Sequence, residues 1–433
     1  MVKGRAGKFQ RSVSIIGIGA TPFCNINDDP ELQGLTEGEF FGTAALEAIA
    51  DAGLEPRDIE FFYHGSANPK FFNNAATPNM QVAEWFGVRG KGSVHHSEAC
   101  CSGYVALQQA VNDVASGAHD IVLTGCVEMA NGLPVPGKPA HIRDELTLDR
   151  LMPDLEAIMD RAYTRALGSG HIGQDDWIDL YRTTYGLTDE QIDEVLNTMS
   201  YNGRRAAALN PLAMYREPFE EAAKRAGMDD PMEYLRSPYN PKTTQYLRVT
   251  GNAPGADGAA CCIVCPTEMA HKFKQKPIEV LGIGSSCLEL MRPHNEMEIT
   301  KEAARQAYEV TGLKPEDIDL LLVNDFVLPS QLLAAEEVGY LPKGEGWKWV
   351  LEGRTAFDGD KPINPHGGRT SYGHAFGASG MADVCEAVKQ LRGQAGPRQV
   401  KNNPKTAMLR GFGGGQNCCI PILRVVEDER RDA

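Results

Sequence analysis

The sequence predicts an α/β fold made of two similar halves, with a long segment inserted into the first half. Two observations lead to this prediction. Segments typical of strands and helices follow one another in the order strand, helix, strand, helix, strand, and this order occurs twice. Short motifs of the first half also return in the second half in the same order. Such alternation implies βαβ units in mixed, mostly parallel sheets, with the halves related by a pseudo-twofold axis.

The repeated motifs are strands with glycines near their ends and helices with a defined stop. Each helix is closed by a glycine that ends it and a proline that prevents it from continuing. In chain order the pairs are Ile15–Gly19 with Val280–Gly284, Gly53–Glu60 with Gly312–Asp319, Phe61–Tyr63 with Leu320–Val323, Ser102–Gly103 with Ser379–Gly380, and Val122–Gly125 with Met408–Gly411. Several pairs in one order indicate a duplicated fold, because chance would produce only isolated pairs.

The predicted organisation has two halves and an insertion. Its parts are an N-terminal half at 1–137 to which 251–270 returns, an inserted, mostly helical segment at 138–250, and a C-terminal half at 271–433. The inserted segment has no counterpart in the second half and is rich in Arg, Tyr and Asp. Two interpretations of it stay open: a surface decoration, or a lid over the active site.

Composition excludes several classes of protein. The 433 residues carry a net charge of −15, which argues against a nucleic-acid-binding role. No apolar run approaches the roughly 18 residues of a membrane span. The basic N-terminus lacks the apolar run of a secretory signal, so we expect a cytoplasmic protein. In that setting the 11 cysteines are expected to be reduced thiols.

Cys100 is the first candidate for chemistry. Its segment, Glu98–Leu107, follows a short strand and opens a helix. A cysteine at a helix N-terminus lies where backbone N–H groups and the helix dipole stabilise a thiolate. Taken alone, Cys-x-Ser-Gly is more typical of a buried structural cysteine. Other segments of the chain favour a nucleophile.

Three other segments carry groups suited to the same chemistry. Asn364–Gly380 is dense in glycine and holds His374 just before a helix, where an imidazole can take the thiol proton of Cys100. Arg410–Gly415 places glycines at a strand end, where N–H groups suit an oxyanion. Asn324 supplies a polar group at the end of another strand.

Together and in this order, these segments resemble the thiolase superfamily, especially its sterol-carrier-protein-x and archaeal branch. Further matches are Gly17–Phe23, Asp257–Ala260, Glu336–Gly339 and Lys343–Gly346. The resemblance covers nearly the whole chain and is weakest over 138–250. It implies duplicated βαβαβαββ halves in an α-β-α-β-α layered arrangement with an inserted loop domain. It also implies an enzyme that transfers acyl groups through an acyl-cysteine.

The resemblance implies a role for each site residue. Cys100 is the acylated nucleophile, and His374 is its base and a donor to one oxyanion hole. Asn324 falls where thiolases keep a residue that fixes an oxyanion water. The backbone N–H groups of Cys100 and Gly413 form a second oxyanion hole, in which one donor is typically worth about 3 kcal/mol.

Coenzyme A and acyl-CoA are the implied substrates, with no covalently bound cofactor. Gly377, Ser379 and Gly414 are the candidates for contacting coenzyme A. We expect no metal, because the zinc-like spacing of Cys262–Cys265 lies inside an apolar strand without a second ligand pair.

Two departures concern the acid/base that forms the enolate. Typical thiolases place a second cysteine where this chain has Gly411, and the sterol-carrier branch places one where it has Phe326. Both positions therefore lack a proton carrier, whose contribution is about 10²–10⁴-fold. Ala375 also replaces the proline that usually follows the histidine.

His64 is the predicted replacement acid/base. The offset between Gly53 and Gly312, applied to Asn324, lands on position 65, next to His64. Both strand ends are then expected to point toward the central cleft. A histidine has the pKa best matched to proton transfer at neutral pH. The competing interpretation is a loop histidine that only caps a turn.

The leading function is therefore a thiolase that cleaves or forms a β-ketoacyl-CoA. A substrate with an aromatic or branched acyl group, such as benzoylsuccinyl-CoA, would suit the missing cysteine. The alternatives are transfer to a non-CoA carbon, as in phloroglucinol acetyltransferases, a retro-aldolase, or a non-catalytic partner on the same scaffold. The resemblance also implies a homodimer and a small zinc-ribbon/OB-fold partner subunit.

Overall fold

A computed structural model describes residues 9–28, 31–32, 34–67, 78–129, 174–287, 297–413 and 417–426. Its centre is a nine-stranded mixed sheet in the order β3-β2-β4-β5-β1-β6-β9-β8-β7. The halves meet where β1 pairs antiparallel with β6, at Val13–Ile15 and Ile278–Val280. From this junction outward, β5, β4 and β2 correspond to β9, β8 and β7. The predicted duplication is therefore visible in the strand order.

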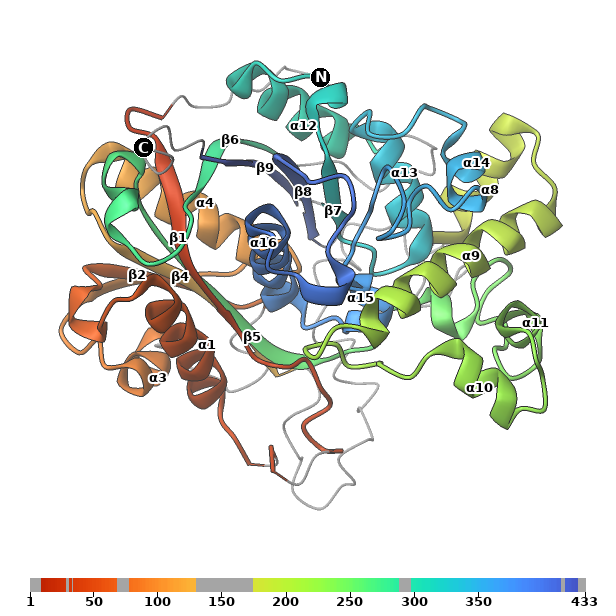
Figure 1. Cartoon of the computed structure of the whole chain (residues 1–433), viewed down its shortest axis with the longest axis horizontal. Coiled ribbons are helices and arrows are strands. Elements are labelled where there is room, and N and C mark those ends of the chain that lie inside the picture. The colour runs from red at the N-terminus through yellow and green to blue at the C-terminus, as the bar shows by residue number, and fades with distance from the viewer. Residues whose placement is uncertain are drawn as a thin grey trace, which may run out of the picture.

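The elements of the first half alternate as the sequence predicts (Figure 1). They are β1 Val13–Ala20, α1 Glu37–Ala52, β2 Phe61–Gly65, α3 Pro78–Ala83, β3 Gly92–His96, α4 Ser102–Ser116, β4 Val122–Met129 and β5 Asp257–Pro266. The described helices between β4 and β5 are α8 Gln174–Tyr185, α9 Asp189–Ala208, α10 Phe219–Arg225 and α11 Pro231–Arg236.

The second half repeats the pattern. Its elements are β6 Ile278–Cys287, α12 Glu298–Thr311, β7 Leu320–Val323, α13 Leu328–Glu337, α14 Gly346–Leu351, α15 Gly368–Tyr372, α16 Phe376–Arg392, β8 Thr406–Gly413 and β9 Asn417–Val425. Within the described ranges, no helix combines the length and the apolar composition needed to cross a bilayer.

Three hydrophobic clusters define the layers. The central cluster packs α4 and α16 between the two halves of the sheet. A second cluster covers the outer face of β1, β2, β4 and β5 with α1. A third covers the outer face of the second half with α12 and α13. The arrangement is the expected α-β-α-β-α layering.

Glycines let the central strands lie directly against the outer helices. A Cβ at Gly19 would lie 2.2 Å from the carbonyl oxygen of Ala44 in α1. In the second half, a Cβ at Gly284 would lie 1.9 Å from the carbonyl oxygen of Ala303 in α12. Both contacts are with backbone atoms that cannot move without shifting the helix. The repeated glycines of the sequence therefore mark the same close strand–helix contact in each half.

Strand β2 directs neighbouring side chains to opposite faces. The Tyr63 hydroxyl donates to Asp113 of α4 at 3.2 Å, on the central side of the sheet. The His64 ring packs at 4.9 Å from the ring of Phe41 in α1, on the outer side. Its side chain is only 1% exposed, and burial lowers the pKa of His64 to about 3. The expectation that His64 points toward the central layer is therefore wrong.

Replacing Gly19 by alanine should destabilise the protein by roughly 1–3 kcal/mol, because the new methyl group meets the backbone of α1. Gly251→Ala is the matched control, since its Cβ would lie 3.4 Å from the nearest atom, in ordinary contact. Thermal unfolding of both variants measures the difference. Equal melting temperatures for the two would contradict the close-contact interpretation.

Burial of neutral His64 should make the protein less stable as the pH falls below about 6.5. In that range the unfolded chain binds a proton that folded His64, with its pKa of about 3, does not. The expected loss is at most about 1.4 kcal/mol per pH unit for this residue. Melting temperatures between pH 7 and 5 should fall less steeply in His64→Phe. A profile for His64→Phe that runs parallel to that of wild type would refute the argument.

Candidate active site

Cys100 and His374 lie in contact although 274 positions separate them in the chain. The Cys100 Sγ atom is 3.2 Å from Nε2 of His374. The thiol is partly exposed, whereas the imidazole is 7% exposed. This distance is short enough for an S–H···N hydrogen bond. The structure therefore brings together the two residues that the sequence identified as nucleophile and base.

A tight turn between β3 and α4 presents Cys100. Ala99 has φ of 47°, a left-handed conformation that is uncommon for a residue with a side chain. The N–H groups of Cys101 and Ser102 donate to the carbonyls of Glu98 and Ala99 at 2.9 and 3.1 Å. The thiol thus sits just before the first turn of α4, near the positive end of its dipole.

His374 is fixed by backbone hydrogen bonds to the segment that enters β5. Its N–H donates to the Pro254 carbonyl at 2.9 Å, and its own carbonyl accepts from the Ala256 N–H at 3.1 Å. The ring of Phe376 lies 5.2 Å from the imidazole. Phe376 itself has φ of 31°. Unusual backbone conformations therefore occur beside both members of the pair.

His374 is held in its neutral form. Burial is the main cause, and the nearby Arg369 guanidinium acts in the same direction, so that the pKa of His374 falls to about 3. A neutral imidazole has a free lone pair that can accept the thiol proton. At neutral pH the imidazole can thus accept a hydrogen bond from the Cys100 thiol.

A buried ion pair supports the segment before His374. Nη1 and Nη2 of Arg369 each donate to the Asp383 carboxylate of α16 at 2.6 Å. The hydroxyl of Tyr104 in α4 donates to the same carboxylate. Arg369 and its hydrogen bonds hold the pKa of Asp383 well below its usual range, against the effect of burial. Side chains from α4, α15 and α16 are thereby joined beneath the reactive pair.

The ends of β7 and β8 adjoin the nucleophile segment. A Cβ at Gly413 would lie 2.6 Å from the Glu98 carbonyl and 2.9 Å from the Cys101 nitrogen, so β8 ends against this turn. The Asn324 Nδ2 group donates to the Phe412 carbonyl at 2.7 Å, and its Oδ1 accepts from the Phe326 N–H at 3.2 Å. The amide of Asn324 therefore fastens the two strand ends together.

The two positions without the usual cysteine are filled by aromatic contacts. A Cβ at Gly411 would lie 2.4 Å from Cδ2 of the Tyr104 ring, which leaves no space for a side chain. Phe326 stacks on Phe412 with ring centroids 6.5 Å apart and packs into the outer cluster of the second half. Neither position supplies a proton carrier.

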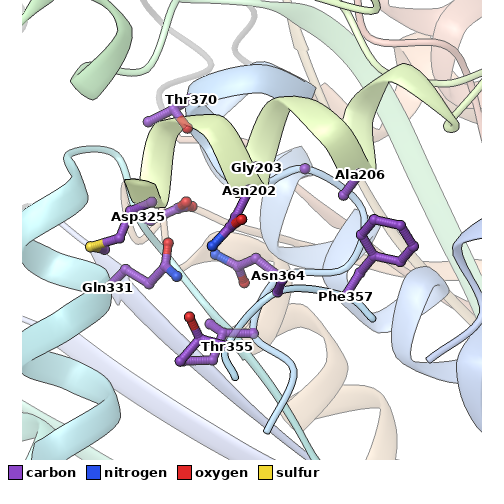
Figure 2. A pocket seen from close by; sticks show the side chains of 13 residues that line it. Asn202, Gly203, Ala206, Asp325, Gln331, Thr355, Phe357, Asn364 and Thr370 are labelled. Atoms are coloured by element: carbon purple, nitrogen blue, oxygen red, sulfur yellow. The ribbon is translucent and has the colours of Figure 1, made fainter. Parts of the chain in front are cut away.

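The inserted region contacts the end of α15, which lies just before His374. Backbone N–H groups of Met214 and Tyr215 donate to the carbonyls of Tyr372 and Ser371 at 3.0 Å. The Arg204 Nε of α9 donates to the Ser371 hydroxyl at 3.1 Å. Figure 2 shows a small pocket at this boundary, lined by Asn202 and Gly203 of α9 together with Asp325, Gln331, Asn364 and Thr370.

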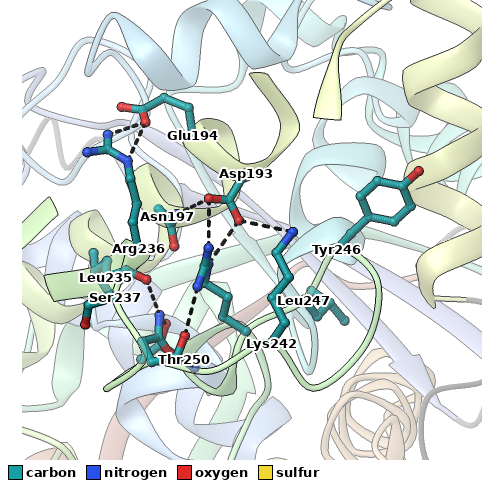
Figure 3. Close-up of polar contacts among 12 residues, drawn as sticks. Asp193, Glu194, Asn197, Leu235, Arg236, Ser237, Lys242, Tyr246, Leu247 and Thr250 are labelled. Atoms are coloured by element: carbon teal, nitrogen blue, oxygen red, sulfur yellow. Dashed lines mark hydrogen bonds and ion pairs between the residues drawn. The ribbon is translucent and has the colours of Figure 1, made fainter. Parts of the chain in front are cut away.

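An electrostatic network stabilises this region internally (Figure 3). The Asp193 carboxylate of α9 accepts from Arg248 at 3.0 and 3.2 Å and from Asn197 at 3.1 Å, and Lys242 lies 3.8 Å away. Arg248 also donates to the Asn240 carbonyl at 3.0 Å. The chain from 235 to 252 is thereby attached to α9. Residues 138–173 of the predicted insertion lie outside the described residues.

Gly377, Ser379 and His64 are the other predicted site residues that the structure describes. Ser379 is fully buried in α16, and a Cβ at Gly377 would lie 2.8 Å from the Ser102 Cβ, so both belong to the helix contact in the core. This placement does not support contact with coenzyme A through these two residues. Gly414 lies outside the described residues. His64 faces α1, on the other side of the sheet from α4.

One buried carboxyl near the pair was not identified from the sequence. Glu128 lies near the end of β4, fully buried, and its Oε1 accepts the backbone N–H of Ala67. Burial raises the pKa of Glu128 well above its usual range. The available signal was a charged residue in an otherwise apolar strand. Across the described ranges, no cluster of three His, Cys, Asp or Glu side chains is arranged to hold a metal.

Gly411→Ala should destabilise the protein, because the added methyl group meets the ring of Tyr104. The cost should be smaller in a Tyr104→Leu background, since the ring is then absent. A double-mutant cycle on melting temperature measures this coupling. Additive effects of the two changes would contradict the idea that Tyr104 excludes a side chain at this position.

Two family models match the two halves of the chain separately. Residues 13–173 match the family described as "Thiolase, N-terminal domain", and residues 288–422 match "Thiolase C-terminal domain-like". The acetyl-CoA acetyltransferase of Methanothermobacter thermautotrophicus is 32% identical over 414 residues, which are 93% of this chain and 97% of that protein.

Two further proteins show similarity over the full length. The benzoylsuccinyl-CoA thiolase subunit BbsB of Thauera aromatica is 30% identical over 419 residues, covering 94% of this chain and 96% of the relative. A solved structure named Ltp2-ChsH2(DUF35) aldolase has a TM-score of 0.76 at 22% identity, with 98% and 100% of the two chains covered. The similarity to BbsB shows common ancestry, and the similarity to the solved aldolase shows the fold. The chain is a member of the thiolase family of acyltransferases.

Proposed function

We propose that this protein exchanges acyl groups between coenzyme A thioesters through an acyl thioester on Cys100. The observation that carries the proposal is the 3.2 Å contact between the Cys100 thiol and the neutral His374 imidazole. Each of the two side chains lies at the start of a helix of the central layer. A nucleophile paired with a base in this way is the arrangement required for covalent acyl transfer.

In the cleavage direction, His374 takes the proton of Cys100 as the sulfur attacks the β-keto carbon of a β-ketoacyl-CoA. The bond between the α and β carbons breaks, the acyl group stays on sulfur, and the enolate of the shorter thioester takes a proton. The thiol of free coenzyme A then attacks the acyl-cysteine, and Cys100 recovers its proton. The N–H groups of Cys100 and Gly413 are the proposed donors to the oxyanion, and Asn324 the proposed holder of an oxyanion water.

The proposed substrate class is a β-ketoacyl-CoA with an aromatic or branched acyl group. Support comes from the similarity to the benzoylsuccinyl-CoA thiolase subunit and from the absence of both usual cysteines at Gly411 and Phe326. A more acidic carbon acid needs less help from a general base. The similarity to acetyl-CoA acetyltransferases supports a small acyl group instead. A panel of β-ketoacyl-CoAs with free coenzyme A distinguishes the two.

The alternative activities differ in whether they need the Cys100 thiol and the His374 imidazole. A non-CoA acceptor would use the same acyl-cysteine, so the acceptor assay must include phenolic carbon nucleophiles. A retro-aldolase is expected not to need a nucleophilic cysteine, and a non-catalytic partner would need neither side chain. The contact between Cys100 and His374 favours the acyl-transfer activities over these two.

We also propose a cytoplasmic assembly with a second copy of the chain and a small zinc-ribbon/OB-fold subunit. The word "subunit" in the name of the BbsB relative and the DUF35 component in the name of the solved aldolase support a partner. Cys126, Cys261 and Cys262 are buried thiols outside any disulfide, which suits a reducing compartment.

Incubation with an acyl-CoA should add one acyl group to the protein, and Cys100→Ala should abolish the addition. The thiol at this position has a base in contact, whereas burial raises the pKa of neighbouring Cys101 well above its usual range. Intact mass and peptide mapping identify the modified residue. Cys101→Ala is the matched control and should still be acylated. An adduct that persists in Cys100→Ala would disprove the mechanism.

A further inference from the structure

The buried carboxyl of Glu128 lies where the two catalytic segments meet. We propose that Glu128 is a positioning residue that sets the contact between Cys100 and His374 by holding the starts of α4 and α16 together. The inference rests on the proposed function for the identity of the reactive pair. It assigns a role to a side chain that the acyl-transfer steps do not use.

Glu128 faces the central layer. It alternates along β4 with Val127, whose side chain belongs to the cluster under α1, and it is fully buried. Its Oε1 accepts the N–H of Ala67, just beyond β2, and lies against Gly377 in the first turn of α16, where an added Cβ would be 3.3 Å away. One side chain thus connects β4, the end of β2 and the start of α16.

The contact with Gly377 is made at a helix terminus. The N-cap of α16 is Ala375, which has no side chain able to bond the first N–H groups. Glu128 supplies an acceptor there from a different part of the chain. Gly377 is three residues after His374, so the carboxyl packs against the backbone that follows the base.

The same junction reaches the nucleophile. A Cβ at Gly377 would lie 2.8 Å from the Cβ of Ser102 and 3.3 Å from Oε1 of Glu128. Ser102 is two residues after Cys100, and its hydroxyl accepts the Glu98 N–H at 2.8 Å. A shift of Gly377 away from Glu128 would therefore change the spacing between the segments that carry sulfur and imidazole.

The role requires an acceptor oxygen and not a charge. Burial raises the pKa of Glu128 well above its usual range, and neighbouring Glu37, whose own pKa is raised by burial to about 7, acts in the same direction. A glutamine at position 128 keeps the shape and an acceptor oxygen. An aspartate keeps the carboxyl but is one methylene too short to reach both the Ala67 N–H and Gly377.

The test compares Glu128→Gln, Glu128→Asp and Glu128→Leu by the rate at which iodoacetamide alkylates Cys100, followed by peptide mass spectrometry from pH 5 to 9. Glu128→Gln should stay within about threefold of wild type, whereas the Asp and Leu variants should react roughly tenfold more slowly at neutral pH. In these two variants the pH profile should also differ from that of wild type, because the contact between the Cys100 thiol and the His374 imidazole is weakened. Exposed Cys287 should react equally in all variants.

Glu336→Leu is the matched control for loss of a buried carboxyl. Glu336 is also buried and accepts two backbone N–H groups, from Gly344 and Gly346 at 2.8 and 2.9 Å, in the outer layer of the second half. This variant should melt at a lower temperature and keep the Cys100 profile. An identical profile change in Glu336→Leu would overturn the proposal, because the effect would then be general destabilisation.

The remaining outcomes also test the positioning role of Glu128. Wild-type profiles in both Glu128→Asp and Glu128→Leu would overturn the positioning role. If Glu128→Leu does not fold, the folded Gln and Asp variants still give opposite expected results. Loss of acyl transfer in Glu128→Gln with a normal alkylation profile would show that the proton of Glu128 is used in the reaction, which also overturns the proposal. Because alkylation needs no acyl-CoA, failure of the proposed function would appear separately, in the Cys100→Ala adduct experiment.

Discussion

The close approach of α4 and α16 is the constraint on which the site depends. A Cβ at Gly103 would lie 2.5 Å from the Gly377 carbonyl and 2.6 Å from the Met381 nitrogen, so the two backbones touch without intervening side chains. Cys100 and His374 each precede one of these helices by two residues. The distance between Cys100 and His374 is therefore set by the backbone contact between the two helices.

The sequence predicted the duplication and the reactive pair because both leave local signals. Glycines that mark close strand–helix contacts recur at corresponding positions of the two halves. Cys100 and His374 each precede a helix and stand within a motif of the family. His64 was misplaced for a geometric reason. The repeat offset pointed to position 65, and Gly65 does face α4, since a Cβ there would lie 3.3 Å from the Ser102 carbonyl. Moving one residue along a strand reverses the face.

The supporting groups could not be predicted, because their roles exist only in the folded chain. Asp383 and Glu128 are acidic residues within apolar segments, and neither has a local sequence partner. Asp383 is paired with Arg369 from α15, whereas burial next to another carboxyl raises the pKa of Glu128. Similarly, only the packing shows that the ring of Tyr104 occupies the space a cysteine at position 411 would need. Long-range contacts of this kind leave no periodic pattern.

The hydrogen bonds from Met214, Tyr215 and Arg204 to residues 371 and 372 limit how this enzyme can be recombined with its relatives. A chimera that exchanges only the inserted region would bring foreign side chains against the loop that carries His374. The described part of the insertion and the segment that carries His374 pack together as one structural unit, although more than 150 positions separate Met214 from Tyr372. Exchanges designed in the laboratory should therefore move the two segments together.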